Sequence, residues 1–444
     1  MEPDLKAICI FAGIGYFLGT DTYWKNLKAL PSGTVNTINK NGYWIQSEKW
    51  FDWYYKPGDL SFDQSVKEFT DLFHQICREQ AGEEKVLLPL SGGLDSRTQA
   101  AAYARLGNDV LSYSYSFSNG YPESAIAEKV AKVFGFEFQK MTIPAGYLWD
   151  CIEELADLLH FGTEFTHPRQ MAVIDQFREM KGVFTLGHWG DVLFDDPAPA
   201  DLTEENAIDK ICERILVKGG RELAEALWET WGLEGEFMSY LKQRVGEIWD
   251  AIPIDHVGAR FRAYLSSTRA VRWTNLGFGI FENANPIRAS YYDDRMAEFI
   301  CGIPEEYLAD RKIQIAYLKQ QSPEVSKITW QAQKPYHLYN FHKNKSPHNL
   351  PYRVTDKLKR MWQEKRGKKF IQRNWELQFL GMENDEKLQD RLFGENLHPF
   401  LPKELIVRFY NQFRTVDAVK YSHPLSMLLT LAVWTGKNHI LRKD

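Results

Sequence analysis

Residues 85–96 read Lys-Val-Leu-Leu-Pro-Leu-Ser-Gly-Gly-Leu-Asp-Ser, and this stretch decides the fold. Its first half is a short apolar run that is typical of a buried strand, and an Ala-rich helical pattern occupies residues 96–106. Between the two, Gly92 and Gly93 let the backbone turn tightly with its N–H groups pointing outward. At the start of a helix such groups form a cradle for an anion, so the stretch predicts a strand, a phosphate-binding turn and a helix.

The sequence on both sides of this unit alternates between strand and helix patterns. Further strands are predicted at 110–117, 136–143 and 182–186, with helices over 123–134 and 167–180. Such alternation predicts an α/β fold in which a parallel sheet is sandwiched by helices.

The two ends of the chain follow other patterns. Residues 1–60 are predicted to be β-rich, with a buried strand at 7–19, and beyond residue 200 long helical patterns dominate. These helical patterns cover 203–250, 257–272, 290–320 and parts of 354–440. We therefore expect a small β unit over 1–60, an α/β domain over 61–345 and a helical C-terminal extension over 346–444.

Composition excludes several classes of protein. The 444 residues carry 54 Lys and Arg against 59 Asp and Glu, so net charge gives no reason to expect binding to nucleic acid or to an anionic membrane. The five cysteines are scattered without a CxxC, which argues against a disulfide framework, a zinc ribbon or a two-cysteine redox site. No stretch approaches twenty apolar residues, so we expect a cytoplasmic protein with no membrane partner.

The turn also carries side chains with chemistry of their own. Ser91 and Ser96 can add hydroxyl donors to the cradle. Asp95 would repel phosphate if it faced it directly, so the sequence predicts that Asp95 binds a Mg²⁺ ion that bridges the phosphates. The turn is therefore expected to bind the pyrophosphate of a nucleotide together with Mg²⁺; the family resemblance that follows implies that this nucleotide is ATP.

The string Ser91-Gly-Gly-Leu-Asp-Ser96 is the signature of the PP-loop ATP pyrophosphatases, and residues 14–340 resemble the synthetase domain of the asparagine synthetase family. The resemblance implies a second motif in Leu186-Gly-His-Trp-Gly-Asp-Val-Leu-Phe194, whose Asp191 would share the Mg²⁺ with Asp95. The ATP-binding residues that it implies are Leu90, Ser91, Gly92, Gly93, Leu94, Asp95, Ser96, Tyr115, Ser116 and Gly187, with adenine held at Leu90, Tyr115 and Ser116.

Three further stretches resemble the family. Pro122-Glu123 opens a helix at the place where relatives carry an acidic residue, and Lys334 stands on the lysine that meets the phosphates in the transition state. Residues 281–288 keep the Glu and Pro of a family motif as Glu282 and Pro286, although Asn285 and Arg288 replace apolar residues there.

Two departures change the expected chemistry. Relatives that make asparagine begin with a catalytic cysteine that hydrolyses glutamine. This chain begins Met-Glu-Pro instead, and its Cys9 lies in an apolar stretch. Only residues 14–54 resemble part of a glutaminase domain, namely its end. We therefore expect ammonia, a partner subunit or a substrate amine to supply the nitrogen. His188 replaces an acidic residue of the glycine-rich turn, at the slot where β-lactam-forming relatives hold a tyrosine paired with the residue matching Glu282. His188 and Glu282 are thus predicted to act as a base and its orienter.

The leading hypothesis is an ATP-dependent, AMP-forming ligase that joins a small-molecule or peptide carboxylate to an amine. A tRNA- or carrier-modifying PP-loop enzyme is an alternative, favoured only by the basic run from Lys357 to Arg373 with its interleaved Trp362 and Phe370. A non-catalytic, ATP-binding subunit of a biosynthetic assembly is a third possibility, favoured by the altered turn.

Overall fold

The computed structural model describes residues 1–121, 124–195, 198–365, 370–394 and 400–438, and it is organised around a five-stranded parallel sheet. The strands lie in the order β5-β4-β3-β6-β7. Their bounds are β3 Val86–Pro89, β4 Val110–Phe117, β5 Glu137–Ile143, β6 Val183–Thr185 and β7 Ile287–Arg288. The predicted α/β fold with a parallel sheet is confirmed, and the strand predicted at 110–117 has the predicted bounds.

Both faces of the sheet are covered by helices. Val86 and Leu88 point into one core, which they share with α2 (Phe62–Ala81), α3 (Asp95–Leu106), α4 (Ser124–Phe134) and α15 (Lys312–Gln321). Leu87 points into the other, with α5 (Tyr147–Leu159), α6 (Ile174–Glu179) and α12 (Phe278–Glu282). The strict alternation along β3 is what a strand buried on both faces requires.

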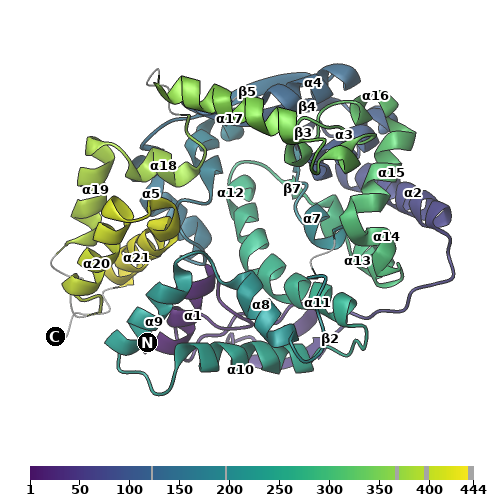
Figure 1. Cartoon of the computed structure of the whole chain (residues 1–444). Helices are drawn as coiled ribbons and strands as arrows, with labels where there is room; N and C mark the ends of the chain where they lie inside the picture. The colour runs from purple at the N-terminus through teal and green to yellow at the C-terminus, as the bar shows by residue number, and fades with distance from the viewer. Residues whose placement is uncertain (122–123, 196–197, 366–369, 395–399, 439–444) are drawn as a thin grey trace.

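The strand order places a switch point beside β3. From β3 the chain moves outward to β4 and β5, which Figure 1 labels at the top of the molecule. It then returns to β6 on the other side of β3. The connections that leave β3 and β6 therefore run in opposite directions from neighbouring carboxyl ends, and this divergence opens a crevice. The two sequence motifs follow these two strands, so the topology brings them together.

The predicted strand at 7–19 is wrong, because this stretch forms α1 (Leu5–Ile14). Every residue from Ala7 to Ile14 is buried, so no polar face shows the helical period, and a short apolar run alone does not distinguish a strand from a buried helix. The helix has ordinary boundaries: the Asp4 side chain accepts a hydrogen bond from the Ala7 N–H at 3.1 Å, and Gly15 ends it with a φ of +83°. The β structure of residues 1–60 is the hairpin of β1 (Thr34–Ile38) and β2 (Trp44–Lys49).

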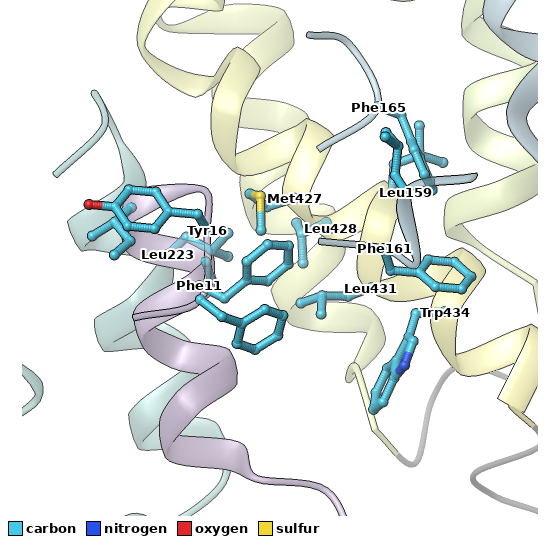
Figure 2. Close-up of a cluster of buried hydrophobic side chains, with 14 of the residues drawn as sticks. Phe11, Tyr16, Leu159, Phe161, Phe165, Leu223, Met427, Leu428, Leu431 and Trp434 are labelled. Atoms are coloured by element: carbon cyan, nitrogen blue, oxygen red, sulfur yellow. The ribbon is translucent and has the colours of Figure 1, made fainter. Parts of the chain in front are cut away.

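Helices from the two ends of the chain pack against each other in one buried cluster. Figure 2 shows Phe11 and Tyr16 from the N-terminal stretch in one cluster with Leu223 of α9 and Leu428 and Trp434 of α21. Besides α12 and α15, the helices beyond β6 are α7 (Gly190–Leu193), α8 (Ala207–Ile215), α9 (Gly220–Thr230), α10 (Phe237–Asp250), α11 (Val257–Leu265), α13 (Asp294–Cys301), α14 (Glu305–Leu308), α16 (Pro323–Ser326), α17 (Leu350–Lys365), α18 (Asn374–Phe379), α19 (Met382–Leu392), α20 (Lys403–Thr415) and α21 (Ala418–Asn438). Among the described residues, none of the helices has the length and apolar character needed to cross a bilayer.

Two predicted helices are broken in the structure. Residues 167–180 contain a 3₁₀ turn, η1 (Arg169–Val173), before α6. The helix predicted over 257–272 is α11 followed by a π-helical segment, η2 (Ser266–Thr274). π-helical segments often occur at functional sites, and η2 lies beside the site described next. The domain boundaries near residues 60 and 345 remain predictions.

Candidate active site at the switch point

The loop from Ser91 to Leu94 is held in shape by its own hydroxyls. The Ser91 N–H donates to Ser96 Oγ at 3.0 Å, and the Gly93 N–H donates to Ser91 Oγ at 3.1 Å. The start of α3 is left without a side-chain cap, so its N–H groups point toward open space at the end of β3. The two serines therefore shape the cradle, while backbone N–H groups remain to receive an anion.

A second segment of the chain supports this loop from outside. The Gly92 carbonyl accepts hydrogen bonds from the Gln331 N–H at 3.0 Å and from the buried Arg97 guanidinium at 3.3 Å. Arg97 also donates to the carbonyls of Ile328 and Thr329. Gly92 has to be glycine here, because a Cβ would lie 2.7 Å from the Gln331 Cβ.

A cavity opens beside the cradle. It has a volume of about 210 Å³ and lies between the ends of β3 and β4, with Leu90, Ser91, Gly92, Tyr115 and Ser116 in its wall. Arg169 and Gln331 also line it. The residues that the sequence assigned to adenine therefore line one cavity next to the phosphate cradle.

Asp95 stands at the start of α3 in a polar cluster. Its Oδ1 accepts hydrogen bonds from Arg311 at 2.5 Å and from Gln314 at 3.0 Å. Burial raises the pKa of the Asp95 carboxyl and the neighbouring charge of Asp191 raises it further, whereas Arg311 opposes both. Asp95 and Asp191 thus lie within electrostatic reach of each other, as the two motifs predict.

The turn after β6 is packed directly against Asp95. A Cβ on Gly190 would lie 2.5 Å from the Asp95 carboxyl carbon and closer still to Oδ1, so only glycine fits. A Cβ on Gly187 would lie 3.4 Å from the Asp95 Cβ, which puts this part of the turn in contact distance as well. Trp189 adopts a φ of +77° and its indole N–H donates to Asn275 at 2.8 Å, which fixes the turn. Asp191 follows at the start of α7 and is exposed.

His188 lies on the other side of the same turn. Its ring meets Phe278 edge-on, with the ring centres 5.1 Å apart, and its Nδ1 is buried without a hydrogen-bond partner. Burial lowers the pKa of His188 to about 4, although the Asp191 carboxylate acts in the opposite direction. The rings of Phe278 and Phe281 form an apolar wall beside the imidazole, which accounts for this burial.

Among the described residues, no hydrogen bond joins Glu282 to His188. Glu282 is exposed at the end of α12, and the acidic group that acts on His188 is Asp191. The two unusual residues of the same stretch are structural: Asn285 donates to the carbonyls of Phe177 and Met180, and Arg288 donates to the Gln80 carbonyl at 2.7 Å.

Lys334 is exposed just after the 3₁₀ turn η6 (Gln331–Gln333), which is joined to the cradle through Gln331. The Pro122-Glu123 pair lies outside the described residues. Sequence reasoning missed Arg311 and Gln314, since nothing in their local sequence marks them as neighbours of a residue more than 200 positions away. A local feature that singles out Arg311 is its strained, left-handed φ of +61°, which is seen in the structure and not in the sequence.

The two carboxylates suit a divalent cation. Oxygen donors of this kind are what Mg²⁺ prefers, and phosphate oxygens commonly complete its coordination. Of the described residues, no three acidic, histidine or cysteine side chains form a ready-made metal cage. The pair would therefore hold Mg²⁺ only together with a phosphate-bearing ligand, with Arg311 as a competing cation on Asp95.

Comparison with known proteins supports the resemblance to the asparagine synthetase family. Residues 68–277 match the family model described as asparagine synthase. No curated protein sequence matches the chain. Among solved structures, an NMN synthetase from Francisella tularensis is similar over 43% of this chain and 96% of its own, with 12% identity and a TM-score of 0.23, which is too low to establish a common fold. Residues 68–277, from within α2 to three residues beyond η2, thus match the asparagine synthase family.

Proposed function

We propose that this chain is an ATP-dependent ligase that adenylates a carboxylate, releases pyrophosphate and then forms an amide with ammonia or with a substrate amine. One observation carries the proposal. The phosphate cradle, the adjoining cavity and the Asp95–Asp191 pair converge at the switch point of an asparagine-synthase-family domain.

In the first step, a carboxylate oxygen attacks the α-phosphorus of ATP. A bond forms between this oxygen and phosphorus, and the bond from phosphorus to the bridging α,β-oxygen breaks, so that an acyl-adenylate and pyrophosphate result. The N–H groups at the start of α3 would receive the pyrophosphate charge, and Lys334 would add a mobile cation from the neighbouring segment. Mg²⁺ held by Asp95 and Asp191 would supply further charge neutralisation on the leaving group.

In the second step, an amine attacks the acyl carbon, AMP leaves with the bonding electron pair, and the amine gives up a proton. We propose that the imidazole of His188 receives this proton. The lowered pKa keeps the imidazole neutral at physiological pH, as a base must be. The proposed orienting role of Glu282 rests on its sequence position alone.

The nitrogen donor is proposed to be ammonia, a substrate amine or the product of a partner subunit. Cys9 is fully buried within α1, and burial raises the pKa of its thiol well above the ordinary value. A thiol in this state is a poor nucleophile, so we propose that Cys9 does not release ammonia from glutamine.

Trapping with hydroxylamine tests this function directly. The purified chain is incubated with Mg·ATP, hydroxylamine and a library of carboxylic acids, and we expect hydroxamate and AMP in equal amounts with the correct acid. Asp191→Asn should abolish both products, whereas the exposed Asp175→Asn serves as the matched control. ADP in place of AMP, or AMP without hydroxamate for every acid, would exclude the proposed adenylation.

A further inference from the structure

Helix α17 turns its apolar side toward solvent. Four apolar side chains follow one another at intervals of four and three residues and therefore share one face of this helix, namely those of Leu350, Val354, Leu358 and Met361. Each is between 46% and 59% exposed, and so is the adjacent Trp362. In an ordinary surface helix such a stripe faces the core, as the buried apolar stripe of α20 does. The α17 stripe, as we call these four side chains, is thus reversed.

The opposite side of α17 faces the protein. Tyr352 and Asp356 each lie two positions beyond a member of the stripe, about 200° around the helix, and both are half-buried. Figure 1 shows α17 along the top of the molecule. The polar side of the helix therefore meets the rest of the chain, and the stripe points away from it.

Contacts at both ends hold α17 in this orientation. Before the helix, the Tyr336 hydroxyl donates to the His348 carbonyl at 2.9 Å. Beyond the helix, Phe370 stacks on Tyr121 with the ring centres 4.7 Å apart, and this tyrosine follows the end of β4. The outward direction of the stripe is thus set by attachments to the α/β domain on either side.

Basic residues accompany the stripe. Arg353 and Lys357 are exposed beside it, and neither forms an ion pair with another described residue. Over residues 350–369 the sequence has eight Lys or Arg against two Asp or Glu, a net charge of +6 in a chain whose formal net charge is −5. The charge of the whole chain, from which we expected no membrane partner, averages over this local excess. An apolar stripe with basic neighbours is typical of a helix that lies in the interface of an anionic bilayer.

We infer that α17 binds the surface of an anionic lipid bilayer, with its stripe among the outer parts of the acyl chains and its basic residues among the headgroups. The combination of the two features identifies the partner. A nucleic acid would neutralise the charge but leave the apolar side chains in water, and a neutral apolar surface would leave the basic residues uncompensated. Binding of this kind is peripheral, and it does not depend on the proposed ligase activity.

Cosedimentation with lipid vesicles tests the charge. The full chain is mixed with vesicles of equal parts phosphatidylserine and phosphatidylcholine, or with vesicles of phosphatidylcholine alone. We expect binding to the mixed vesicles to be at least about tenfold tighter, because each basic residue near an anionic surface strengthens binding about fivefold. Added salt should weaken it by screening. Arg353→Gln combined with Lys357→Gln should reduce the preference for mixed vesicles at least about tenfold.

The apolar stripe is tested by a second double variant. Val354→Gln combined with Leu358→Gln places good helix formers at exposed positions, so the helix should persist, which circular dichroism checks. Its binding to mixed vesicles should be at least about tenfold weaker, since two apolar side chains no longer enter the bilayer. Val416→Gln is the matched control, because Val416 is also exposed but lies in the turn between α20 and α21, and it should bind as the unaltered chain does.

Four results would overturn the inference. The first is equal binding to both kinds of vesicle, or binding to neither. The second is a stripe variant that binds mixed vesicles as tightly as the unaltered chain, because the contact would then be electrostatic alone. In sedimentation without lipid, a dimer that the stripe variant disrupts would assign the face to a second copy of the chain. Finally, binding to tRNA in place of vesicles would assign the basic residues to RNA.

Discussion

Gly190 offers a direct test of the way the two motifs meet. Replacing its hydrogen by a methyl group places a carbon 2.5 Å from the Asp95 carboxyl carbon and 2.8 Å from the Asp95 Cβ. Carbon atoms in contact prefer separations of roughly 3.5–4.0 Å, so the turn and the carboxylate have to move apart by about 1 Å. All three atoms that the methyl group would meet belong to the Asp95 side chain, and its Cβ is attached directly to the first turn of α3, so no rotation of the side chain moves this atom away.

This displacement predicts two separable effects of Gly190→Ala. Overpacking a site of this kind costs about 1–3 kcal/mol of unfolding free energy, which urea denaturation measures. A misplacement of about 1 Å among reacting groups can reduce turnover about 10²-fold, which hydroxamate formation measures. We expect both effects, with the loss of turnover exceeding the loss of stability.

Gly436→Ala is the control for Gly190→Ala. Gly436 lies in α21, and a Cβ there would meet no atom within 4 Å, so the substitution should leave turnover unchanged and stabilise the helix by up to about 1 kcal/mol. If Gly190→Ala retained turnover within about threefold of the natural chain, the contact between the turn and Asp95 would not determine the position of the carboxylate.

Three further predictions concern the support of the site and of the fold. Gly92→Ala should weaken nucleotide binding at least about tenfold, because its methyl group would clash with Gln331. Adding Gln331→Gly should restore part of the nucleotide affinity, and a double variant without any recovery would contradict the packing argument. Arg97→Met should lower the unfolding free energy by about 2–4 kcal/mol because it deprives several buried carbonyls of their donor, whereas a change below about 0.5 kcal/mol would contradict that role. Burial lowers the pKa of His423 to about 4, so the folded state binds fewer protons than the unfolded state, and stability is lost as pH falls from about 6.5 toward 4. His423 should account for about 2 kcal/mol of the stability lost between pH 7.5 and pH 5, so the unfolding free energy of His423→Gln, from urea denaturation, should fall by that much less than that of the unaltered chain; an equal fall in both would contradict the prediction.

The centre of the fold was predictable because its signals are local. The apolar run before Ser91, the two glycines and the Ala-rich helix lie within about twenty residues, and each has one favoured conformation. The second motif was predictable from its resemblance to the same family. The sheet then brings both motifs to neighbouring strand ends, as parallel topology requires.

The features that could not be predicted depend on packing across long distances. The N-terminal helix is buried on all sides, so its sequence has no amphipathic period, although Asp4 and Gly15 mark its ends in retrospect. The pairing of Arg311 with Asp95 and the meeting of Arg269 with His167 near Trp273 join segments that the sequence separates widely. The pKa of His188 depends on Phe278 and Phe281 around it, which its own position in the turn does not reveal.

Isotope exchange between pyrophosphate and ATP is the most direct test of the central claim. Labelled pyrophosphate, Mg²⁺, ATP and a carboxylic acid identified by hydroxylamine trapping are incubated with the chain, and label should enter ATP only when the acid and Mg²⁺ are both present. Asp191→Asn should abolish exchange, while His188→Ala should preserve it and slow amide formation by about 10²–10⁴-fold. Failure of label to enter ATP with that acid, or exchange that persists unchanged in Asp191→Asn, would contradict reversible adenylation at this site.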